Sequence, residues 1–330
     1  MIKKDYNKSM QMVEAVPNVS EGTNLEKIRR IVQAAAAVPG AQVLHVDPNP
    51  DANRTVITLA GTPAAILKST FLLLQQALQE IDMRTQHGVH PRLGAVDVCP
   101  LVPVRGLSLP QTAALADQLA QQAADKLHLP IYLYEANART AARKNLAFIR
   151  QGEYENLPQK LHALPPDYGP TDWDDRVAKT GACVMGARQF LIAFNMSLST
   201  KDVQTAQEIA SLLREKNGGL KAVKAIGWYM EAYRCAQVSC NLTDYSQTGL
   251  AEVFETCKQL AAARGTSVTA GELIGLVPQE ALLQAGRYYT PDQQNSAALL
   301  KAAVSNLQLS QLRPFLIEER VLEYRLNQAF

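Results

Sequence analysis

Cysteine is scarce in this sequence, and its five thiols are scattered along the chain. No two of them form a Cys-x-x-Cys pair, and the number is odd; the positions are Cys99, Cys183, Cys235, Cys240 and Cys257. This pattern argues against a disulfide framework and against a zinc knuckle. We therefore expect reduced thiols and a cytosolic (cytoplasmic) protein.

The chain also lacks an excess of charge of one sign and lacks long apolar runs. The formal net charge is +2, and no block of five basic residues occurs, so we expect no nucleic-acid partner. No run approaches the roughly 18 apolar residues that a membrane span needs. Residues 1–5 carry charge without the apolar segment of a signal peptide behind them. We therefore expect neither membrane association nor secretion.

Three familiar catalytic signatures are missing as well. The sequence has no Gly-x-Gly-x-x-Gly after a strand, no Walker phosphate loop and no Gly-x-Ser-x-Gly elbow. Nucleotide-dependent transfer and serine hydrolysis therefore lose support. What is present is a globular composition, with 330 residues of which 47% are hydrophobic and 19% are charged. A chain of this length and composition suggests two domains, with one large domain as the alternative.

The second half has the clearer alternation of strands and helices. The predicted order is strand, helix, strand, strand, helix and strand, at residues 189–195, 201–216, 223–230, 236–242, 250–264 and 266–276. This βαββαβ order predicts an α+β fold, a ferredoxin-like sandwich with helices on one face of an antiparallel sheet. The first half has the same order with one extra helix and strand. We expect two such subdomains, residues 1–187 and 188–330.

Local signals in the first half give three more specific expectations. Thr23 and Glu26 have the spacing of a capping box at the start of a helix. Pro100 and Pro103 are expected to end their apolar strand early. Proline and glycine break every periodicity over residues 152–187, which predicts a long loop or linker with a functional role.

Residues 86–100 place a histidine, His90, in a polar loop directly ahead of a buried strand. A rigid neighbouring strand holds such a side chain while leaving it open to a ligand. Imidazole gains or loses a proton near neutrality, so we assign His90 to acid–base chemistry. Two alternatives remain open: a metal site that adds His87 and Asp97, or a His90 that is merely satisfied within the fold.

Three arginines lie at loop or strand-edge positions among small or polar neighbours; they are Arg54, Arg92 and Arg188. A guanidinium group grips a carboxylate at two points, so these side chains predict an acidic small-molecule ligand. The alternative is that they are ordinary solvated surface residues. From the residues alone, the chain reads as a two-domain protein with a His/Arg site.

Several motifs then lie in one order along nearly the whole chain. They are VPNVSEG at 16–22, NRTV at 53–56, HPRLGAVDVCP at 90–100, GARQFLIAFN at 186–195, IGWY at 226–229 and GLVP at 275–278. Together they resemble the glutamate formimidoyltransferase family, the formiminotransferase part of formiminotransferase-cyclodeaminase. The resemblance stops where the transferase part stops, so we expect no cyclodeaminase domain. Gln86 and His87 stand where the family usually has His and Lys.

The resemblance implies transfer of a formimino group from N-formimidoyl-L-glutamate to N5 of tetrahydrofolate in histidine breakdown. It implies tetrahydrofolate as co-substrate without a metal, a groove between two ferredoxin-like subdomains, and a homodimer. It places the catalytic histidine on His90 and a folate-contacting loop on residues that include Gly169, Pro170, Lys179, Thr180 and Gly181.

Further roles follow from that reaction as expectations. Asp47 would orient the His90 imidazole or stabilise its charged form. The substrate carboxylates would be bound by a set of cationic side chains, namely Arg54, Arg92, Lys179 and Arg188. Asn18 and Asn53 would supply neutral polar contacts. Three rivals remain: formyl transfer between 5-formyltetrahydrofolate and glutamate, a non-catalytic folate-binding protein, and a metal-dependent hydrolase.

Overall fold

The computed structural model describes residues 11–330. Residues 1–5, used above in the expectation about a signal peptide, lie outside this range. Contacts divide the chain into two units, one that runs to Gln189 and one that spans Phe190–Ala329. Within the described residues, no helix is both long and apolar enough to cross a membrane.

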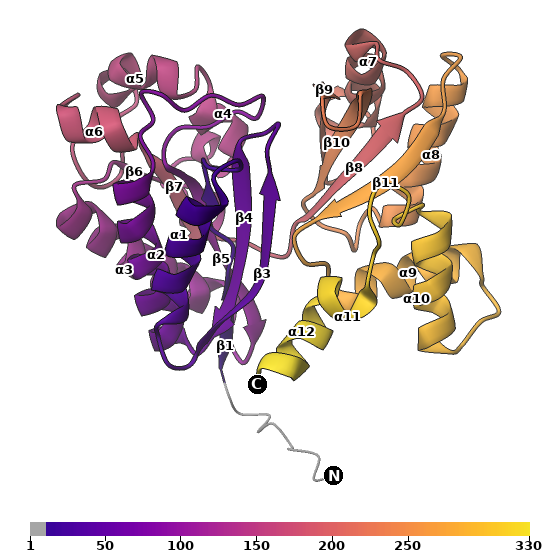
Figure 1. Ribbon diagram of the computed structural model, residues 1–330, viewed down its shortest axis with the longest axis horizontal. Helices are drawn as coiled ribbons and strands as arrows, with labels where there is room; N and C mark the ends of the chain where they lie inside the picture. The colour runs from indigo at the N-terminus through magenta and orange to yellow at the C-terminus, as the bar shows by residue number, and fades with distance from the viewer. Residues whose placement is uncertain (1–10) are drawn as a thin grey trace. The chain divides into compact units, whose positions relative to one another are not determined.

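A mixed sheet forms the centre of the first unit (Figure 1). Its edge strand β3 (Ala41–Asn49) pairs with β4 (Arg54–Gly61), and β4 pairs with both β1 (Met12–Ala15) and β2 (Asn18–Val19). These two short strands lie in one line, interrupted at Pro17. They pair antiparallel with β5 (Val96–Arg105), and the sheet continues with the parallel strands β7 (Cys183–Ala187) and β6 (Ile131–Leu133).

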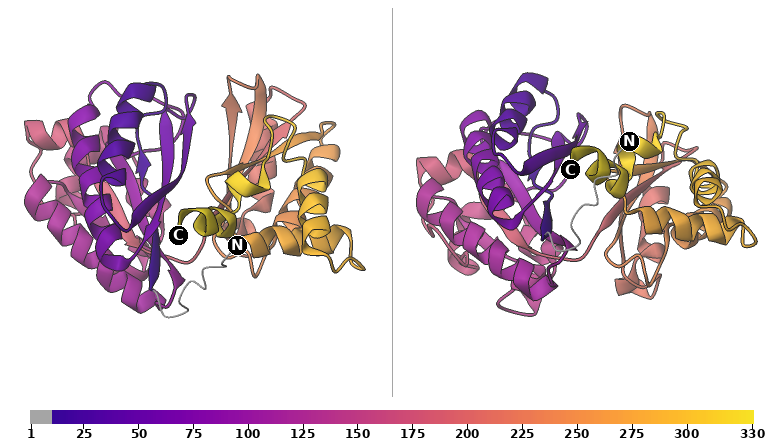
Figure 2. Two further views of the ribbon diagram at one scale, coloured as in Figure 1. Left: turned by 60° about the horizontal axis from the view of Figure 1, so that its bottom comes forward. Right: turned by 90° about the horizontal axis from the view of Figure 1, so that it is seen from below.

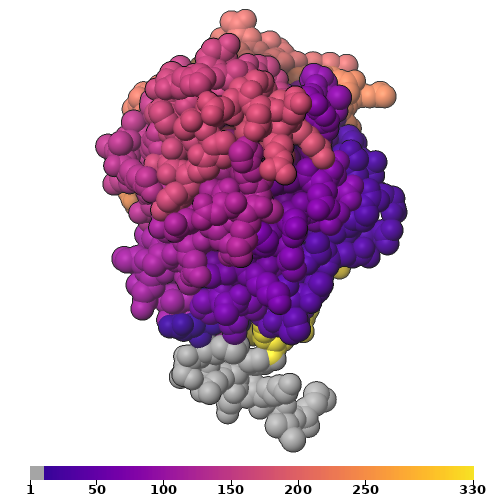
Figure 3. All heavy atoms as spheres, turned by 90° about the vertical axis from the view of Figure 1, so that its left-hand side faces the viewer, coloured from indigo at the N-terminus to yellow at the C-terminus, as the bar shows by residue number. Residues whose placement is uncertain are grey.

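Helices cover both faces of this sheet. The long helices α1 (Leu25–Ala36), α2 (Pro63–Glu80) and α3 (Leu109–Leu127) bury their apolar positions in the larger core (Figures 1 and 2). The short helices α4 (Leu146–Arg150), α5 (Leu157–Ala163) and α6 (Asp175–Thr180) close a smaller core over Val98 and Val184. In Figure 3 the pink atoms of α6 and the segment before it form part of the visible surface of this unit.

The second unit follows the predicted order of strands and helices. It consists of β8 (Ile192–Leu198), α7 (Val203–Leu213), β9 (Val223–Met230), β10 (Cys235–Leu242), α8 (Leu250–Ala262) and β11 (Val268–Ile274). The four strands are antiparallel in the order β11-β8-β10-β9, and α7 and α8 pack on one face through the apolar core. The chain ends with the helices α9 (Gln279–Tyr289), α10 (Ser296–Asn306), α11 (Ile317–Arg320) and α12 (Leu322–Ala329).

The expected loop or linker at 152–187 is wrong, because this segment contains α5, α6 and the sheet strand β7. The two helices have only seven and six residues, too few for a helical period to stand out in the sequence. Pro158 starts α5 rather than breaking a helix, since a proline in the first turn loses no helical hydrogen bond.

Two further local expectations are also wrong. Strand β5 continues through both prolines to Arg105, because a proline lacks an N–H but keeps its carbonyl, and Pro100 O accepts from Val16 N at 3.0 Å. The cap of α1 is Asn24, whose side chain accepts from the backbone N–H groups of residues 26 and 27. Thr23 instead donates its hydroxyl to Glu21 Oε1 at 2.9 Å, so no capping box forms.

Candidate active site

The loop that carries His90 packs closely against the turn between β3 and β4. At Gly88 an added Cβ would lie 2.4 Å from the carbonyl oxygen of Ala52, so only glycine permits this approach. Asn53, in that turn, donates from Nδ2 to His87 O at 2.6 Å. The NRTV motif and the histidine motif, far apart in the sequence, therefore meet in the fold.

A second anchor of the same loop is Arg92. Its Nε donates to Gln86 Oε1 at 2.9 Å, and one Nη2 bond goes to the Gln86 carbonyl at 3.2 Å. The remaining bonds go to Glu153 at 3.1 Å and to the two carboxylate oxygens of Glu155 at 2.8 and 2.6 Å. A guanidinium has five N–H donors, so all of them are engaged. Arg92 ties the His90 loop to the segment before α5.

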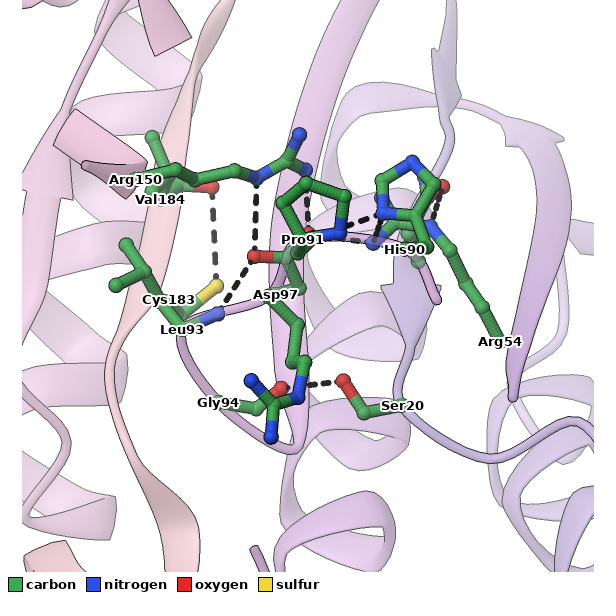
Figure 4. A network of polar contacts seen from close by, with 12 residues as sticks. Ser20, Arg54, His90, Pro91, Leu93, Gly94, Asp97, Arg150, Cys183 and Val184 are labelled. Carbon is green, nitrogen blue, oxygen red and sulfur yellow. Dashed lines mark hydrogen bonds and ion pairs between the residues drawn. The ribbon is translucent and has the colours of Figure 1, made fainter. Parts of the chain in front are cut away.

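Asp97, at the start of β5, is the buried centre of the charged cluster in Figure 4. Its side chain is 0% exposed and receives two guanidinium groups. Arg54, from β4, donates to Oδ2 at 2.5 Å. Arg150, the last residue of α4, donates from Nε to Oδ1 at 3.2 Å and from Nη2 to Oδ2. The backbone N–H of Leu93 adds a bond to Oδ1 at 3.0 Å.

The cluster holds two cations on one anion, and this imbalance sets the ionisation of its members. Burial alone would raise the pKa of Asp97, but Arg150 and Arg54 outweigh burial and hold that pKa at about 2. Burial and the neighbouring Arg150 lower the pKa of Arg54 to about 10, against the attraction of Asp97. At neutral pH all three groups are charged, and the cluster carries a net positive charge.

His90 is partly exposed and lies at the edge of this cluster (Figure 4). Burial, then the positive charges of Arg54 and Arg150, hold its pKa well below the ordinary 6.5. Nδ1 lies 2.8 Å from the carbonyl oxygen of Pro91 and 3.4 Å from Arg54 Nη1. A carbonyl can only accept, so Nδ1 carries the hydrogen and Nε2 the lone pair. The arrangement makes His90 a neutral base at pH 7.

The remaining predicted residues of the NRTV side are Asn18, Asp47 and Asn53. Asn18, in β2, accepts from Arg54 Nε at 3.0 Å and donates to the Val16 carbonyl at 2.8 Å. Asp47 is buried in β3, and its Oδ2 lies 3.8 Å from His45 Nε2. Asn53 holds two backbone groups, since its Oδ1 also accepts from Gly22 N at 2.9 Å.

The predicted folate loop falls into two parts. Its end meets the His90 loop, because Ala95 N donates to Thr180 O at 2.8 Å and Gly94 bridges to Gly181. Gly181 has φ +66° and leaves no room for a Cβ against Leu93 O. The start of the loop lies elsewhere: Gly169 packs against Leu129 O, and Pro170 is the next residue.

Two predicted cations of this group contact backbone oxygens. Lys179, on α6, donates to Gln79 O at 3.1 Å, near the end of α2. Arg188, directly after β7, is partly exposed and donates to Gln189 O at 2.9 Å. Arg188 also lies beside Tyr134, whose pKa burial raises to about 12.

The geometry of the described residues gives no support to the alternative of a metal site. Over residues 11–330, no group of three or more His, Cys, Asp or Glu side chains is placed to hold a metal ion. His87 is exposed, and Asp97, which the sequence offered as a third ligand, is taken up by Arg54 and Arg150.

Sequence reasoning missed Arg150 entirely and assigned Asp97 only to a possible metal site. Arg150 lies 53 positions after Asp97 on a helix of five residues. No local pattern distinguishes such an arginine from a solvated one. For Asp97 a signal was available, because a carboxylate within an otherwise apolar strand must be paired when buried.

Comparison with known proteins identifies relatives over nearly the whole chain. A model of the formiminotransferase domain, N-terminal subdomain, matches residues 12–188, and one of the formiminotransferase domain matches residues 193–327. Formimidoyltransferase-cyclodeaminase of Sus scrofa is 43% identical over 333 residues, which cover 97% of this chain and 60% of that protein. Glutamate formimidoyltransferase of Streptococcus pyogenes serotype M1 is 39% identical over 280 residues, 84% of this chain and 93% of that protein. The chain thus spans 60% of the length of the first of these relatives.

Proposed function

This chain belongs to the formiminotransferase family, and from that premise we propose that it is a glutamate formimidoyltransferase. It transfers the formimino group of N-formimidoyl-L-glutamate to N5 of tetrahydrofolate and yields 5-formimidoyltetrahydrofolate and L-glutamate, a step of histidine degradation. The observation that carries the proposal is His90, a neutral imidazole beside a positively charged cluster, within the segment that matches the family's N-terminal subdomain.

The proton balance of the reaction gives His90 its task. When N5 adds to the formimino carbon it must lose a proton, and the glutamate nitrogen must gain one as its bond to that carbon breaks. A neutral His90 takes the first proton at Nε2 and returns it to the leaving nitrogen. The sequence predicted acid–base chemistry at His90, and the lowered pKa of His90 supports acceptance of the proton first. General acid–base catalysis of this kind is worth about 10²–10⁴ in rate.

Asp47 remains our proposal for the group that stabilises the imidazolium while His90 holds the proton. Its burial in β3 supports this role, because a carboxylate in a poorly solvated place interacts strongly with a nearby cation.

Arg54 is the best supported of the proposed anion-binding residues. Among the contacts of residues 11–330, none involves its Nη2, while Nε and Nη1 are held by Asn18 and Asp97. The guanidinium is thus oriented with donors left for a substrate carboxylate. We propose Lys179 and Arg188 as further cations for glutamate and folate carboxylates. Arg92 has no donor left, so we assign it to holding the His90 loop.

Neutral contacts to the substrates complete the proposed site. Asn18 and Asn53 lie on the Arg54 side, and Thr180 and Gly181 lie against the His90 loop. Gly169 and Pro170 remain proposals from the family resemblance alone.

The fold, the co-substrate, the oligomeric state and the location are proposed together with the function. The strand order of the second unit supports a ferredoxin-like fold, and we propose two such subdomains, with the boundary in the chain near residues 187 and 188. Tetrahydrofolate is the proposed co-substrate, without a metal. We also propose a homodimer located in the cytosol, where cysteines that are all free would stay reduced.

A direct assay tests the proposed function. Purified protein is given N-formimidoyl-L-glutamate and tetrahydrofolate, and 5-formimidoyltetrahydrofolate is followed by its absorbance, with His90→Gln as the matched control. Product formed by the wild type and strongly reduced in the control supports the proposal. Turnover only with 5-formyltetrahydrofolate and glutamate would make it a formyltransferase, and folate binding without product from any donor would make it a binding protein.

A further inference from the structure

Lys160, on α5, is a buried cation whose partners are all backbone oxygens. Its residue is 6% exposed, and its Nζ donates to Ile149 O and Gln151 O, each at 2.5 Å. No carboxylate within residues 11–330 forms an ion pair with it. Burial lowers its pKa to about 8, so the ammonium form still predominates at neutral pH. Burying a charge without a counter-ion costs free energy. Among the described residues, the partners that offset this cost are the two backbone carbonyls.

The two carbonyls that Lys160 binds belong to the residues on either side of Arg150. One ammonium group therefore fixes both ends of the short backbone segment from which the Arg150 side chain leaves. Arg150 is also the last residue of α4, a helix of five residues, which has little stability of its own. The carbonyls at a helix end carry partial negative charge and attract a cation.

The side chain of Arg150 connects this backbone segment to the surroundings of His90. The Arg150 guanidinium binds Asp97 through Nε and Nη2, and its positive charge helps to lower the pKa of His90. We propose that Lys160 is a positioning residue of the active site: it clamps the backbone around Arg150 and so keeps that guanidinium on Asp97 beside His90. The effect of Lys160 on turnover rests on the proposed function, whereas its effect on the surroundings of His90 does not.

A purely structural role is the competing explanation. In that case Lys160 would only stabilise α4 and α5, and its loss would lower stability without changing the surroundings of His90. The charged groups with the largest effect on the pKa of His90 are Arg54, Arg150 and Asp97. Release of Arg150 would remove one of the two cations from this set and raise the pKa of His90 toward 6.5.

The test compares Lys160→Met, Lys160→Arg, Arg150→Met and the double variant Lys160→Met/Arg150→Met. The pKa of His90 is measured by NMR on protein labelled with ¹³C in the histidine rings, and the resonance is assigned from its loss in His90→Gln. We expect this pKa to rise in Lys160→Met and in Arg150→Met, with no further rise in the double variant, because both changes act through Arg150. Lys160→Arg, with donors for both carbonyls, should restore the wild-type value.

Kinetics give the second readout, with Arg143→Met as the matched control. Arg143 is another buried cation: it donates to Pro165 O at 2.6 Å and forms an ion pair with Asp167, also at 2.6 Å. Among the contacts of residues 11–330, none joins it to Arg150. We expect kcat to fall about 10- to 100-fold in Lys160→Met, as misplaced groups typically cost, with the acid limb of the rate profile moved to higher pH. Arg143→Met should lower the unfolding temperature and leave that limb in place.

The outcomes separate this inference from the proposed function. An unchanged His90 pKa in Lys160→Met, or a shift equal to that in Arg143→Met, would overturn the positioning role even in a fully active enzyme. A wild-type protein without transferase activity would overturn the proposed function, while a His90 pKa that rises in Lys160→Met would still support the clamp.

Discussion

Two buried carboxylates, Asp97 in the first unit and Glu272 in the second, have different surroundings. Asp97 in the first unit is held by two guanidinium groups. Glu272 in the second unit is 4% exposed and accepts from two neutral groups, Tyr233 OH at 2.7 Å and Gln237 Nε2 at 3.4 Å. Arg313 forms an ion pair with Glu272 Oε1 at 3.7 Å.

The two units also differ in their histidines. All five lie in the first unit, and residues 190–330 contain none. A cluster with surplus positive charge next to an imidazole favours a neutral base. This difference is consistent with our proposal that proton transfer takes place in the first unit.

The largest expected effect is on stability, from Asp97→Asn. Loss of this anion leaves two buried guanidinium groups facing each other, and breaking a buried pair in this way costs about 3–5 kcal/mol. The matched change in the second unit, Glu272→Gln, should cost only about 1–3 kcal/mol, since its hydrogen-bond donors are neutral and its ion pair with Arg313 is long, at 3.7 Å. Urea unfolding measures both. Equal losses would show that the two carboxylates are equivalent after all.

His90→Ala should produce the largest effect on turnover. We expect kcat to fall about 10²–10⁴-fold, the usual value of general acid–base catalysis, while tetrahydrofolate still binds. Steady-state kinetics and a folate titration measure the two quantities. His128→Ala is the control, because His128 lies on the surface and pairs with Asp174 at 2.8 Å. Near-normal turnover in His90→Ala would remove the proton-transfer role.

Acid should weaken the first unit through Asp97. Its pKa in the fold is about 2 against an ordinary 3.8, so the group binds fewer protons folded than unfolded. Its contribution to stability is therefore present above pH 4 and is lost as the pH falls from about 4 to about 2, and amounts to about 2 kcal/mol. Unfolding free energies across this range should fall less steeply in Asp97→Asn. Parallel curves would speak against the assigned pKa.

The smallest predicted effect concerns Arg54. Alanine here would also remove a partner of Asp97, so lysine is the sharper test: it keeps the charge but loses the second terminal nitrogen. We expect the KM for formimidoylglutamate to rise about tenfold, equivalent to about 1.4 kcal/mol of binding, with a smaller change in kcat. An unchanged KM would leave Arg54 with a structural role only.

The sequence predicted most of the fold because long amphipathic elements leave periodic patterns. Helix α3, for example, begins at a capping box formed by Ser108 and Gln111. The features that the sequence did not predict depend on contacts between residues that lie far apart in the chain. The helices of residues 152–187 are too short to show a period, and their place is set by packing on Val98 and Val184.

Some residues of the candidate site could also be recognised locally in the sequence, and others could not. His90 and Arg54 stand out locally as polar residues beside apolar strands. Arg150 does not, because its importance lies in a contact with Asp97 across 53 residues. The engagement of all donors of Arg92 likewise depends on Glu153 and Glu155, which no motif connects to the His90 loop.

The ionisation of His90 in the intact protein tests the central claim most directly. A ¹³C NMR titration of labelled histidine rings, with His90→Gln to assign the resonance, gives its pKa without substrate. The account predicts a value below 6.5, so that the ring is neutral at pH 7, and a rise when Arg150 is replaced by methionine. A pKa at or above 6.5 that does not respond to Arg150 would contradict it.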